Sequence, residues 1–424
     1  MSIARRRLNS PRRTDRKDAP RSICWLSRAL ATVVAICFLV VPASAQNYSI
    51  LFNFSGGAVG SAPAGLAIDA AGRLYGTTYF GGSGGGGTAF RLSRAGSGWV
   101  LSTLYSFNGT TGGDEPGILV IGPDGALYGT TLSGGAPCNC GVVFRLRPSP
   151  HACSSTLCPW HEEILYEFQG TPDGANPSGS PLTFDSAGNI YGTTLYGGSE
   201  SAPGTVFQLS PSAGGWTERV IHTFHGYDGS HPAGSLAFDS AGDMYGTTEN
   251  GGLDDIGTVY ELSPDGSDWT YSVLHSFGSE GFPIAGVVLD PSGNLYGGTL
   301  LSPGNAFEMS LHDGFWSYTS LYQFDGGEDW GGVSGNLLRD PSGNLYGPVM
   351  TGGYPRGQGS IFKLAPAGGS WTYTDLHDFG EGADGVGPQG GLVRDSSGNL
   401  YGVTIGGGQY SDGIIYEISQ SAIK

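Results

Sequence analysis

A short pattern of polar, apolar and glycine positions recurs along most of this chain. It consists of Asp, two variable residues, Gly, another variable residue, an aliphatic residue, Tyr and Gly. Its tyrosines are Tyr75, Tyr128, Tyr191, Tyr245, Tyr296, Tyr346 and Tyr401, at intervals of 53, 63, 54, 51, 50 and 55 residues. A period of about 50 residues that occurs seven times is typical of a propeller or a solenoid.

Each repeat predicts four short strands. In residues 234–277 an apolar run is followed by an Asp-x-x-Gly hairpin and the sequence Met-Tyr-Gly-Thr-Thr. Gly257–Ser263 then alternates with period two, and Trp269–Phe277 follows after a Pro-Asp-Gly turn. Val, Thr and aromatic residues dominate these segments, and no helical period of 3.6 is sustained. Four antiparallel strands in about 50 residues describe one propeller blade.

The two ends of the repeat array predict a closed ring. A fourth-strand segment, 48–54, precedes every other strand, and the last repeat stops after its third strand at Ser419. We therefore expect the N-terminal strand to complete the seventh blade, which removes exposed sheet edges. An open solenoid, the alternative, would need polar caps at its ends. The predicted fold is an all-β, seven-bladed β-propeller of four-stranded antiparallel blades over residues 46–424.

The first 45 residues have a different composition. Nine of the chain's 20 Lys and Arg lie between Arg5 and Arg28, followed by an apolar run, 29–41, and by Ala43-Ser44-Ala45. This order predicts a secretory signal peptide cleaved after Ala45, because the apolar run is too short to span a bilayer. An uncleaved signal anchor is the alternative. We expect a secreted or periplasmic protein with no membrane span after cleavage.

The predicted mature chain is strongly acidic. It keeps 11 Lys and Arg (20 minus 9) and 35 Asp and Glu (37 minus 2), a formal charge of about −24. Nucleic acid is not an expected partner, because phosphate backbones require basic patches. Regularly placed aromatic residues, 11% of the chain, also argue against disorder.

The chain resembles the Gloeobacter–Verrucomicrobia (GloVer) tandem-repeat family, whose repeat centres on Gly-Asn-Leu-Tyr-Gly-Thr-Thr followed by a Gly-Thr-Val-Phe strand. The match is clearest at Asn189–Thr194 with Gly204–Phe207, while residues 297–299, 347–349 and 402–404 lose one or both threonines. The resemblance covers nearly all of the predicted mature chain. It implies an exported protein, often with a C-terminal sorting signal in such proteins, and no established reaction.

Four cysteines are disulfide candidates in this exported chain. Cys138 and Cys140 precede a third strand, whereas Cys153 and Cys158 follow it. Seven strand residues of roughly 3.3 Å each keep the two pairs too far apart for a bridge between them. We expect Cys153–Cys158 and either a Cys138–Cys140 bridge or free thiols. A zinc site is the alternative, although the spacing does not fit common zinc modules.

The loops between blades carry acidic residues. Asp114, Asp173, Asp228, Asp329 and Asp384 lie in such loops, and Asp329 precedes Trp330, a tryptophan outside the regular strand positions. Two readings are open: a calcium- or sugar-binding rim, or an Asp turn within each blade. We treat the five aspartates and Trp330 as candidate ligand-binding residues. The A–B hairpins are nearly identical and are read as framework, so the opposite face is the expected binding face.

No catalytic motif stands out, and His222, His275 and His377 occupy a register that holds Phe or Tyr elsewhere, which indicates packing. We expect a monomeric binding or interaction module with an extracellular glycan or protein partner, no required cofactor, and calcium as an option. An extracellular polysaccharide hydrolase or lyase that uses rim carboxylates is the first alternative, and a structural surface protein is the second. The sequence favours a protein that is not an enzyme.

Overall fold

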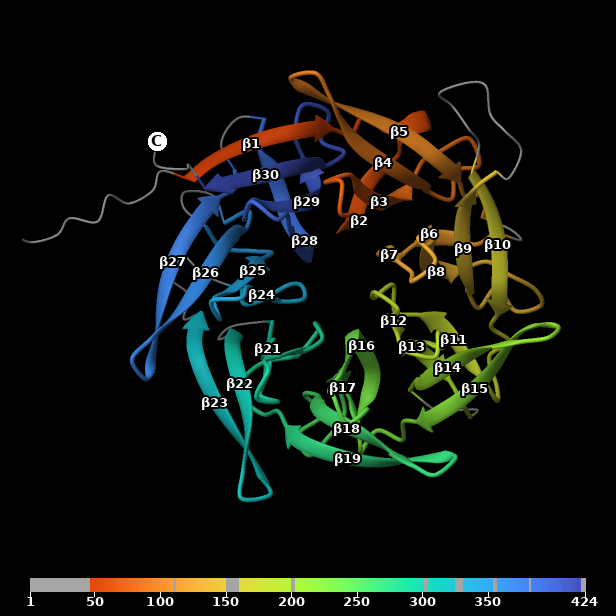
Figure 1. The fold of residues 1–424 in the computed structure, drawn as a ribbon, viewed down its shortest axis with the longest axis vertical. Helices are drawn as coiled ribbons and strands as arrows, with labels where there is room; N and C mark the ends of the chain where they lie inside the picture. Colours follow the sequence, from red (N-terminus) through yellow and green to blue (C-terminus); the bar gives the residue numbers. More distant parts are fainter. Residues whose placement is uncertain are drawn as a thin grey trace, which may run out of the picture. The chain divides into compact units, whose positions relative to one another are not determined.

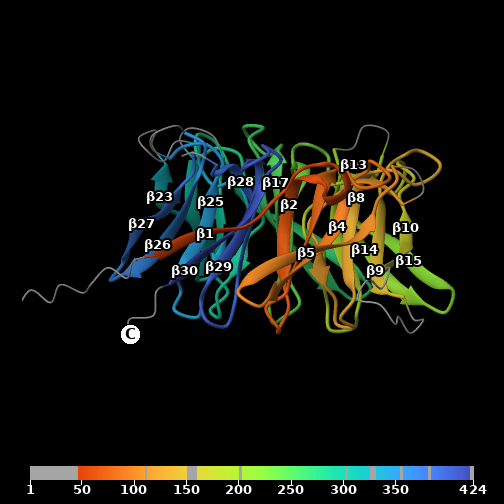
Figure 2. The ribbon, with the colours of Figure 1, turned by 90° about the horizontal axis from the view of Figure 1, so that it is seen from above.

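The computed structural model describes residues 46–109, 112–149, 160–199, 203–300, 304–324, 331–353, 357–380 and 383–420. Within them the chain forms seven antiparallel sheets arranged around a central axis, as Figure 1 shows, and the strands run across the thickness of the ring (Figure 2). The described residues contain one 3-10 helix, η1 (Gly57–Val59), and no α-helix. The predicted seven-bladed β-propeller is confirmed. The predicted signal peptide, residues 1–45, lies outside the described residues.

Each blade has strands A to D from the axis outward. Blade 1 contains β2 (Ser61–Ile68), β3 (Leu74–Phe80), β4 (Thr88–Ala95) and β5 (Gly98–Ser106). Blade 2 contains β6 (Asp114–Pro116) with β7 (Val120–Ile121), then β8 (Leu127–Ser133), β9 (Val142–Pro148) and β10 (Trp160–Glu167). Blade 3 contains β11 (Gly174–Pro177) with β12 (Thr183–Phe184), then β13 (Ile190–Gly197), β14 (Thr205–Ser212) and β15 (Gly215–Thr223).

The remaining blades follow the same order. Blade 4 contains β16 (Ser230–Phe238), β17 (Met244–Asn250), β18 (Thr258–Asp265) and β19 (Asp268–Ser276). Blade 5 contains β20 (Val288–Leu289), β21 (Leu295–Gly298), β22 (Gly304–His312) and β23 (Phe315–Phe324). Blade 6 contains β24 (Leu338–Arg339), β25 (Leu345–Val349), β26 (Ser360–Ala367) and β27 (Ser370–Asp378). Blade 7 contains β28 (Gly385–Arg394), β29 (Leu400–Gly407), β30 (Ile414–Gln420) and β1 (Gln46–Asn53).

The N-terminal strand closes the ring, as the sequence predicts. Strand β1 pairs antiparallel with β30, from Gln46 opposite Gln420 to Asn53 opposite Ile414, and the two lie side by side in Figure 1. The Tyr48 hydroxyl donates to Asp384 Oδ1 at 2.6 Å, and its ring stacks on His377 of blade 6 at 3.6 Å. The first described strand is therefore held by two neighbouring parts of the ring, which leaves no open edge at this seam.

A phenylalanine at the end of each fourth strand fills the space between blades. All seven are fully buried: Phe54, Phe107, Phe168, Phe224, Phe277, Phe324 and Phe379. Each lies against the third-strand aromatic of the following blade, as Phe54 does against Phe90 at 5.3 Å between ring centroids. Full burial of such a side chain contributes roughly 1.5–3 kcal/mol. These contacts join each blade to the next.

The recurring Asp and Tyr build the A–B hairpin. Asp185 Oδ1 accepts the backbone N–H groups of Ala187 and Asn189, while Oδ2 accepts the Asn189 side chain and the Tyr191 hydroxyl. Gly188 completes the turn with a φ of 85°, which a side chain would strain. The same bonds recur around Asp290, Asp340 and Asp395. The repeated motif is a local turn that satisfies its own polar groups.

Glycines let the inner strands meet near the axis. A Cβ atom on Gly234 would collide with the backbone nitrogen of Gly286 in the next blade, and one on Gly117 would collide with Gly179. Ile118 N–H donates to the Gly179 carbonyl at 2.9 Å, so backbone groups bond directly between blades. A central cavity of about 140 Å³ remains, lined by residues of all seven blades. A second cavity of about 400 Å³ shares lining residues with it, so the space near the axis extends beyond the smaller cavity.

Candidate functional site

The acidic residues predicted from the sequence lie in the loops that connect strand D to strand A of the next blade. Asp173 and Asp228 are buried, with 6% and 8% exposure. Asp173 accepts the Tyr166 hydroxyl at 2.6 Å, and Asp228 Oδ2 lies 3.1 Å from His222 Nε2. Their carboxylates are therefore engaged by side chains of the outer strands.

Asp384 and Asp114 are also engaged locally. Asp384 accepts the Tyr48 hydroxyl and lies 3.0 Å from His377 Nε2. Burial alone would raise the pKa of the Asp384 carboxyl, but the bonds from His377, Tyr48 and Gly385 lower it overall. Asp114 accepts the N–H of Glu115 at 3.1 Å. These contacts are those expected if each aspartate forms a turn within its own blade.

Within the described residues, no hydrogen bond links any two of these four aspartates. Asp329 and Trp330 lie outside the described residues, so their place in a binding face stays a prediction. Among the described residues no group of three or more His, Cys, Asp and Glu is arranged to hold a metal ion. Calcium binding stays a prediction.

The histidines of the outer strands pack between blades. His222 stacks on Tyr271 at 3.9 Å, His275 on Tyr318 at 4.5 Å, and His377 on Tyr48 at 3.6 Å, each with the outer strand of the following blade. The packing role predicted from their register is therefore what the structure shows.

A cleft between blades 7 and 1 brings together a different set of residues. It encloses about 690 Å³ on the face that carries the A–B and C–D hairpins, which we call the hairpin face. This is the face that the sequence analysis interpreted as framework. We call this cleft the arginine cleft; it is lined by residues 68–73, Ser93, Arg94, residues 394–396 and Tyr401.

Three arginines line the cleft, and two of them, Arg73 and Arg94, occupy positions that the other blades fill with different residues. Arg394 ends β28 opposite Leu400, at the register of Ile68, Ile121, Phe184, Phe238, Leu289 and Arg339. Arg73 stands where four blades have Asn, and Arg94 stands opposite Trp99, where Pro211, Pro264 and Pro366 face their tryptophans. The repeated hairpin sequence therefore does not explain why these positive charges gather at one seam.

Two of the three guanidinium groups are held by contacts within the structure. Arg73 Nε donates to Asp69 Oδ2 at 2.6 Å within its own hairpin. Arg94 lies 4.5 Å above the Trp99 ring and 3.4 Å from Glu417 of blade 7, with a side chain 60% exposed. No ion pair of Arg394 is found among the described residues. Trp99 in turn packs edge to face against Tyr401, with 6.2 Å between ring centroids.

The cleft offers more free donors than free acceptors. Asp395 accepts four hydrogen bonds, from Ser397 N, Asn399 N, Asn399 Nδ2 and the Tyr401 hydroxyl. Burial alone would raise the pKa of this carboxyl, but these bonds lower it, so it is ionised and fully occupied at neutral pH. A guanidinium has five N–H donors and no acceptor. The arrangement therefore suits a ligand that is rich in acceptors, above all a carboxylate or sulfate.

Reading the sequence one repeat at a time missed these arginines. The signal was present, since the seven repeats can be superposed on their Asp and Tyr positions. Superposed in this way, Arg73 and Arg94 stand out as departures, and Arg394 shares its position with Arg339 of blade 6. What the superposition alone does not reveal is that the three meet at one seam, because they come from both ends of the repeat array.

A second cleft on the same face lies between blades 3 and 4. It encloses about 510 Å³, and Phe184, Phe238, Pro264 and Trp269 are among its lining residues, with no Lys or Arg. Tyr191 contacts both Phe238 and Trp269 edge to face, at 5.0 and 6.1 Å. We call it the aromatic cleft. It has the same hairpin frame with apolar side chains in place of charge.

Comparison with family models assigns nearly all of the chain. The model described as Gloeobacter/Verrucomicrobia repeat matches residues 36–161, 154–326 and 271–423. A comparison with curated protein sequences finds no match. No described helix is long and apolar enough to cross a membrane.

Solved structures with a similar fold are distant in sequence. The extracellular domain of a candidate hybrid two-component system from B. thetaiotaomicron has 14% identity and a TM-score of 0.53 over 89% of this chain. A candidate 6-phosphogluconolactonase from Bacteroides uniformis has 15% identity and a TM-score of 0.52, covering 80% of this chain and 89% of its own. The match spans 41% of that extracellular-domain chain. At such identities the likeness concerns the fold alone.

Proposed function

The chain belongs to the Gloeobacter/Verrucomicrobia repeat family, and from this premise we propose that it is an exported binding module whose arginine cleft takes an acidic glycan. The observation that carries the proposal is the meeting of Arg73, Arg94 and Arg394 in one cleft. These are three of the 11 Lys and Arg in residues 46–424. A framework position would carry the same residue in most blades.

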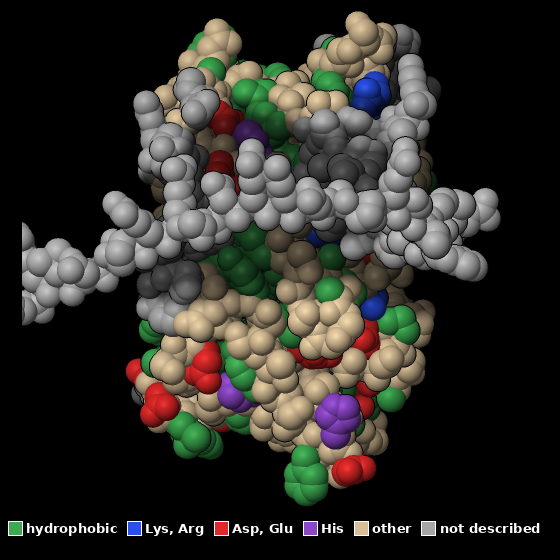
Figure 3. Space-filling model, turned by 90° about the vertical axis from the view of Figure 1, so that its left-hand side faces the viewer, with side chains coloured by type: hydrophobic (Ala, Val, Ile, Leu, Met, Phe, Trp, Pro, Cys, Tyr) green, Lys and Arg blue, Asp and Glu red, His purple; other side chains and the backbone are tan. Residues whose placement is uncertain are grey.

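The chemistry of the cleft supports a sugar ligand with an isolated acid group. Guanidinium groups bind carboxylate or sulfate through paired N–H donors. The partly exposed Trp99 packs edge to face against Tyr401, which lines the cleft, and such an aromatic side chain is of the kind that binds the face of a sugar ring. The rest of the surface is acidic: on the side drawn in Figure 3, Asp and Glu side chains are spread over the described part and few Lys or Arg are visible.

That acidic surface restricts the ligand further. At physiological salt, charges more than about 8 Å apart are largely screened, but a long polyanion would still meet many carboxylates at close range. A glycan that carries one acid group among neutral sugars avoids this repulsion. We therefore propose a uronate-containing oligosaccharide rather than a uniformly charged polymer.

The test is calorimetric titration of the full chain, expressed for export, with a uronate-containing oligosaccharide and with its carboxyl-reduced, uncharged counterpart. The Arg394→Gln variant is expected to bind the uronate ligand about tenfold more weakly, since a charge-assisted hydrogen bond contributes about 1.5–3 kcal/mol. Binding of the reduced ligand is expected to be unchanged. Arg219→Gln is the matched control, because Arg219 lies on the outer strand of blade 3 and pairs with Asp268.

Two results would contradict this assignment. One is equal affinity of Arg394→Gln and the native chain for the uronate ligand. The other is loss of binding in Trp330→Ala with full retention in Arg394→Gln, which would place the site on the opposite face, where the sequence analysis expected it.

A further inference from the structure

The Cys138–Cys140 disulfide lies on the face opposite the arginine cleft, in the B–C loop of blade 2. It links two residues that are separated by Asn139 alone, with 5.2 Å between Cα atoms. A disulfide stabilises a fold mainly by restricting the unfolded chain, and the effect grows with the length of the loop that it closes. A three-residue loop gives the smallest restriction, so stability accounts poorly for this bridge.

Blade 4 forms a similar turn, one residue shorter, without a disulfide. In blade 2 the N–H of Gly134 donates to Asn139 Oδ1 at 2.9 Å, and Asn139 has a φ of 62°. In blade 4 the N–H of Gly251 donates to Asp255 Oδ1 at 3.0 Å, and Asp255 has a φ of 59°. Backbone bonds from Gly141 to Gly134 and from Gly257 to Gly251, both 2.9 Å, close the two turns alike.

Asp254 and Ile256 stand where blade 2 has Cys138 and Cys140. A turn closed by the same bonds therefore forms in a sequence with no cysteines.

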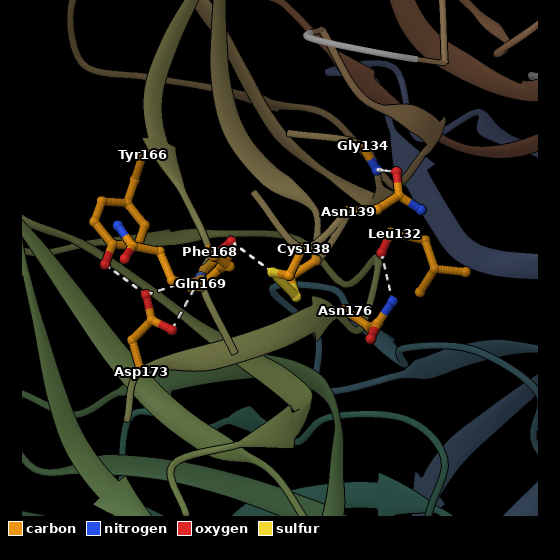
Figure 4. The surroundings of a disulfide bond; sticks show 10 residues. Leu132, Gly134, Cys138, Asn139, Tyr166, Phe168, Gln169, Asp173 and Asn176 are labelled. Atoms are coloured by element: carbon orange, nitrogen blue, oxygen red, sulfur yellow. Dashed lines mark hydrogen bonds between the residues drawn. A yellow bond between two sulfur atoms is a disulfide. The ribbon is translucent and has the colours of Figure 1, made fainter. Parts of the chain in front are cut away.

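The surroundings of the bridge favour its reduced form. Cys138 is exposed and Cys140 is half-buried, so an incoming thiol can reach the Sγ of Cys138. That Sγ lies 3.3 Å from the carbonyl oxygen of Phe168, as Figure 4 shows. A thiol at this position can donate a hydrogen bond to the carbonyl, whereas a disulfide sulfur cannot. Stabilising the dithiol makes a disulfide a better oxidant.

We propose that Cys138–Cys140 is a thiol–disulfide exchange site that oxidises an extracellular protein dithiol. A substrate thiolate attacks the Sγ of Cys138, the Cys138–Cys140 bond breaks, and Cys140 leaves as a thiolate that takes up a proton. The second substrate thiol, as its thiolate, then attacks its own partner sulfur and releases Cys138 as a thiol. The substrate gains one disulfide, this chain gains two thiols, and a low-molecular-weight disulfide such as oxidised glutathione restores the bridge.

The first experiment measures the redox equilibrium of the pair in the full chain, expressed for export. Cys153→Ser/Cys158→Ser leaves Cys138 and Cys140 as the only cysteines of the predicted mature chain. This variant is equilibrated in buffers of varied reduced-to-oxidised glutathione ratio, and free thiols are trapped by alkylation and counted by mass spectrometry. We expect the Cys138–Cys140 pair to be half reduced at a glutathione ratio within this range. A pair that stays fully oxidised, or fully reduced, at every ratio would overturn the proposal.

The second experiment measures transfer to a peptide that contains two cysteines. Oxidised Cys153→Ser/Cys158→Ser is expected to form the peptide disulfide at least tenfold faster than the same variant with Cys138→Asp and Cys140→Ile, the residues of blade 4. Cys140→Ser is expected to accumulate a mixed disulfide between Cys138 and the peptide. Equal rates with and without the pair, or no adduct on Cys138, would contradict the assignment. Circular dichroism confirms that each variant retains the β-sheet spectrum.

Discussion

The arginine cleft and the aromatic cleft occupy equivalent seams of one propeller, yet their chemistry differs. Both have the Asp–Tyr hairpin frame, with Asp395 and Tyr401 in one and Asp185 and Tyr191 in the other. The residue that ends the inner strand is Arg394 in the first and Phe184 in the second. The frame therefore fixes the position of a side chain, and the residue at that position changes the chemistry of the seam.

The largest expected effect is on ligand binding at the arginine cleft. Replacing Arg73 with Asn and Arg394 with Phe installs the residues of blade 3 at both positions. We expect the uronate ligand to bind about 100-fold more weakly, because two charge-assisted contacts of about 1.4 kcal/mol each are lost. Calorimetry measures the loss, and an unchanged melting temperature shows that the frame is intact. A loss smaller than threefold would mean that these arginines do not contact the ligand.

The next effect tests whether the frame is the same in both clefts. Asp395→Ala and Asp185→Ala each remove four hydrogen bonds that close a hairpin. We expect each to lower the free energy of unfolding by about 1–3 kcal/mol, measured by urea denaturation. The two values are expected to agree within about 0.5 kcal/mol. A larger difference would show that Asp395 and Asp185 contribute to stability through contacts other than these hydrogen bonds.

A third, smaller effect is a gain of binding. Phe184→Arg places a guanidinium at the register of Arg394 but in the aromatic cleft. In the Arg73→Asn/Arg394→Phe background it is expected to recover about tenfold of the lost affinity, which corresponds to one charge-assisted contact. Phe184→Gln in the same background is the uncharged control. No recovery would mean that the neighbouring Arg94 and Trp99 are needed as well as the charge.

The smallest effect is on acid stability. Hydrogen bonding holds the pKa of Asp185 and Asp395 below the usual value despite burial, so each carboxylate contributes stability above its unfolded pKa of about 3.9. That contribution is lost as the pH falls through the lower folded pKa. Between pH 5 and pH 3, the free energy of unfolding of Asp395→Asn is expected to fall by less than that of the native chain. A steeper loss in the variant would contradict this sign.

Local chemistry explains why most of the fold could be predicted from the sequence. The Asp-x-x-Gly-x-aliphatic-Tyr pattern satisfies its own hydrogen bonds within a few residues, so it forms the same hairpin wherever it occurs. The Phe at the end of each fourth strand meets a third-strand aromatic at a constant register. Ring closure by residues 48–54 could be predicted by counting strands. The first and the last strand of the array each lack a neighbour, so each can pair only with the other.

The candidate site could not be predicted in the same way. Asp173 and Asp228 carry residue types that suggest a ligand, but their bonds to Tyr166 and His222 lie within the framework. Arg94 and Arg394 are 300 residues apart in sequence. They line one cleft because closing the ring places the first blade beside the last.

The sequence by itself determined the repeat, the seven blades, the strand that closes them and the acidic charge. These properties depend on local periodicity and composition, which each segment carries independently of the others. Only the tertiary structure decided which side chains share a seam, which carboxylates are already occupied, and that blade 4 closes a similar turn without a disulfide. Those properties depend on distances between segments far apart in the chain, and such distances exist only once the ring has closed.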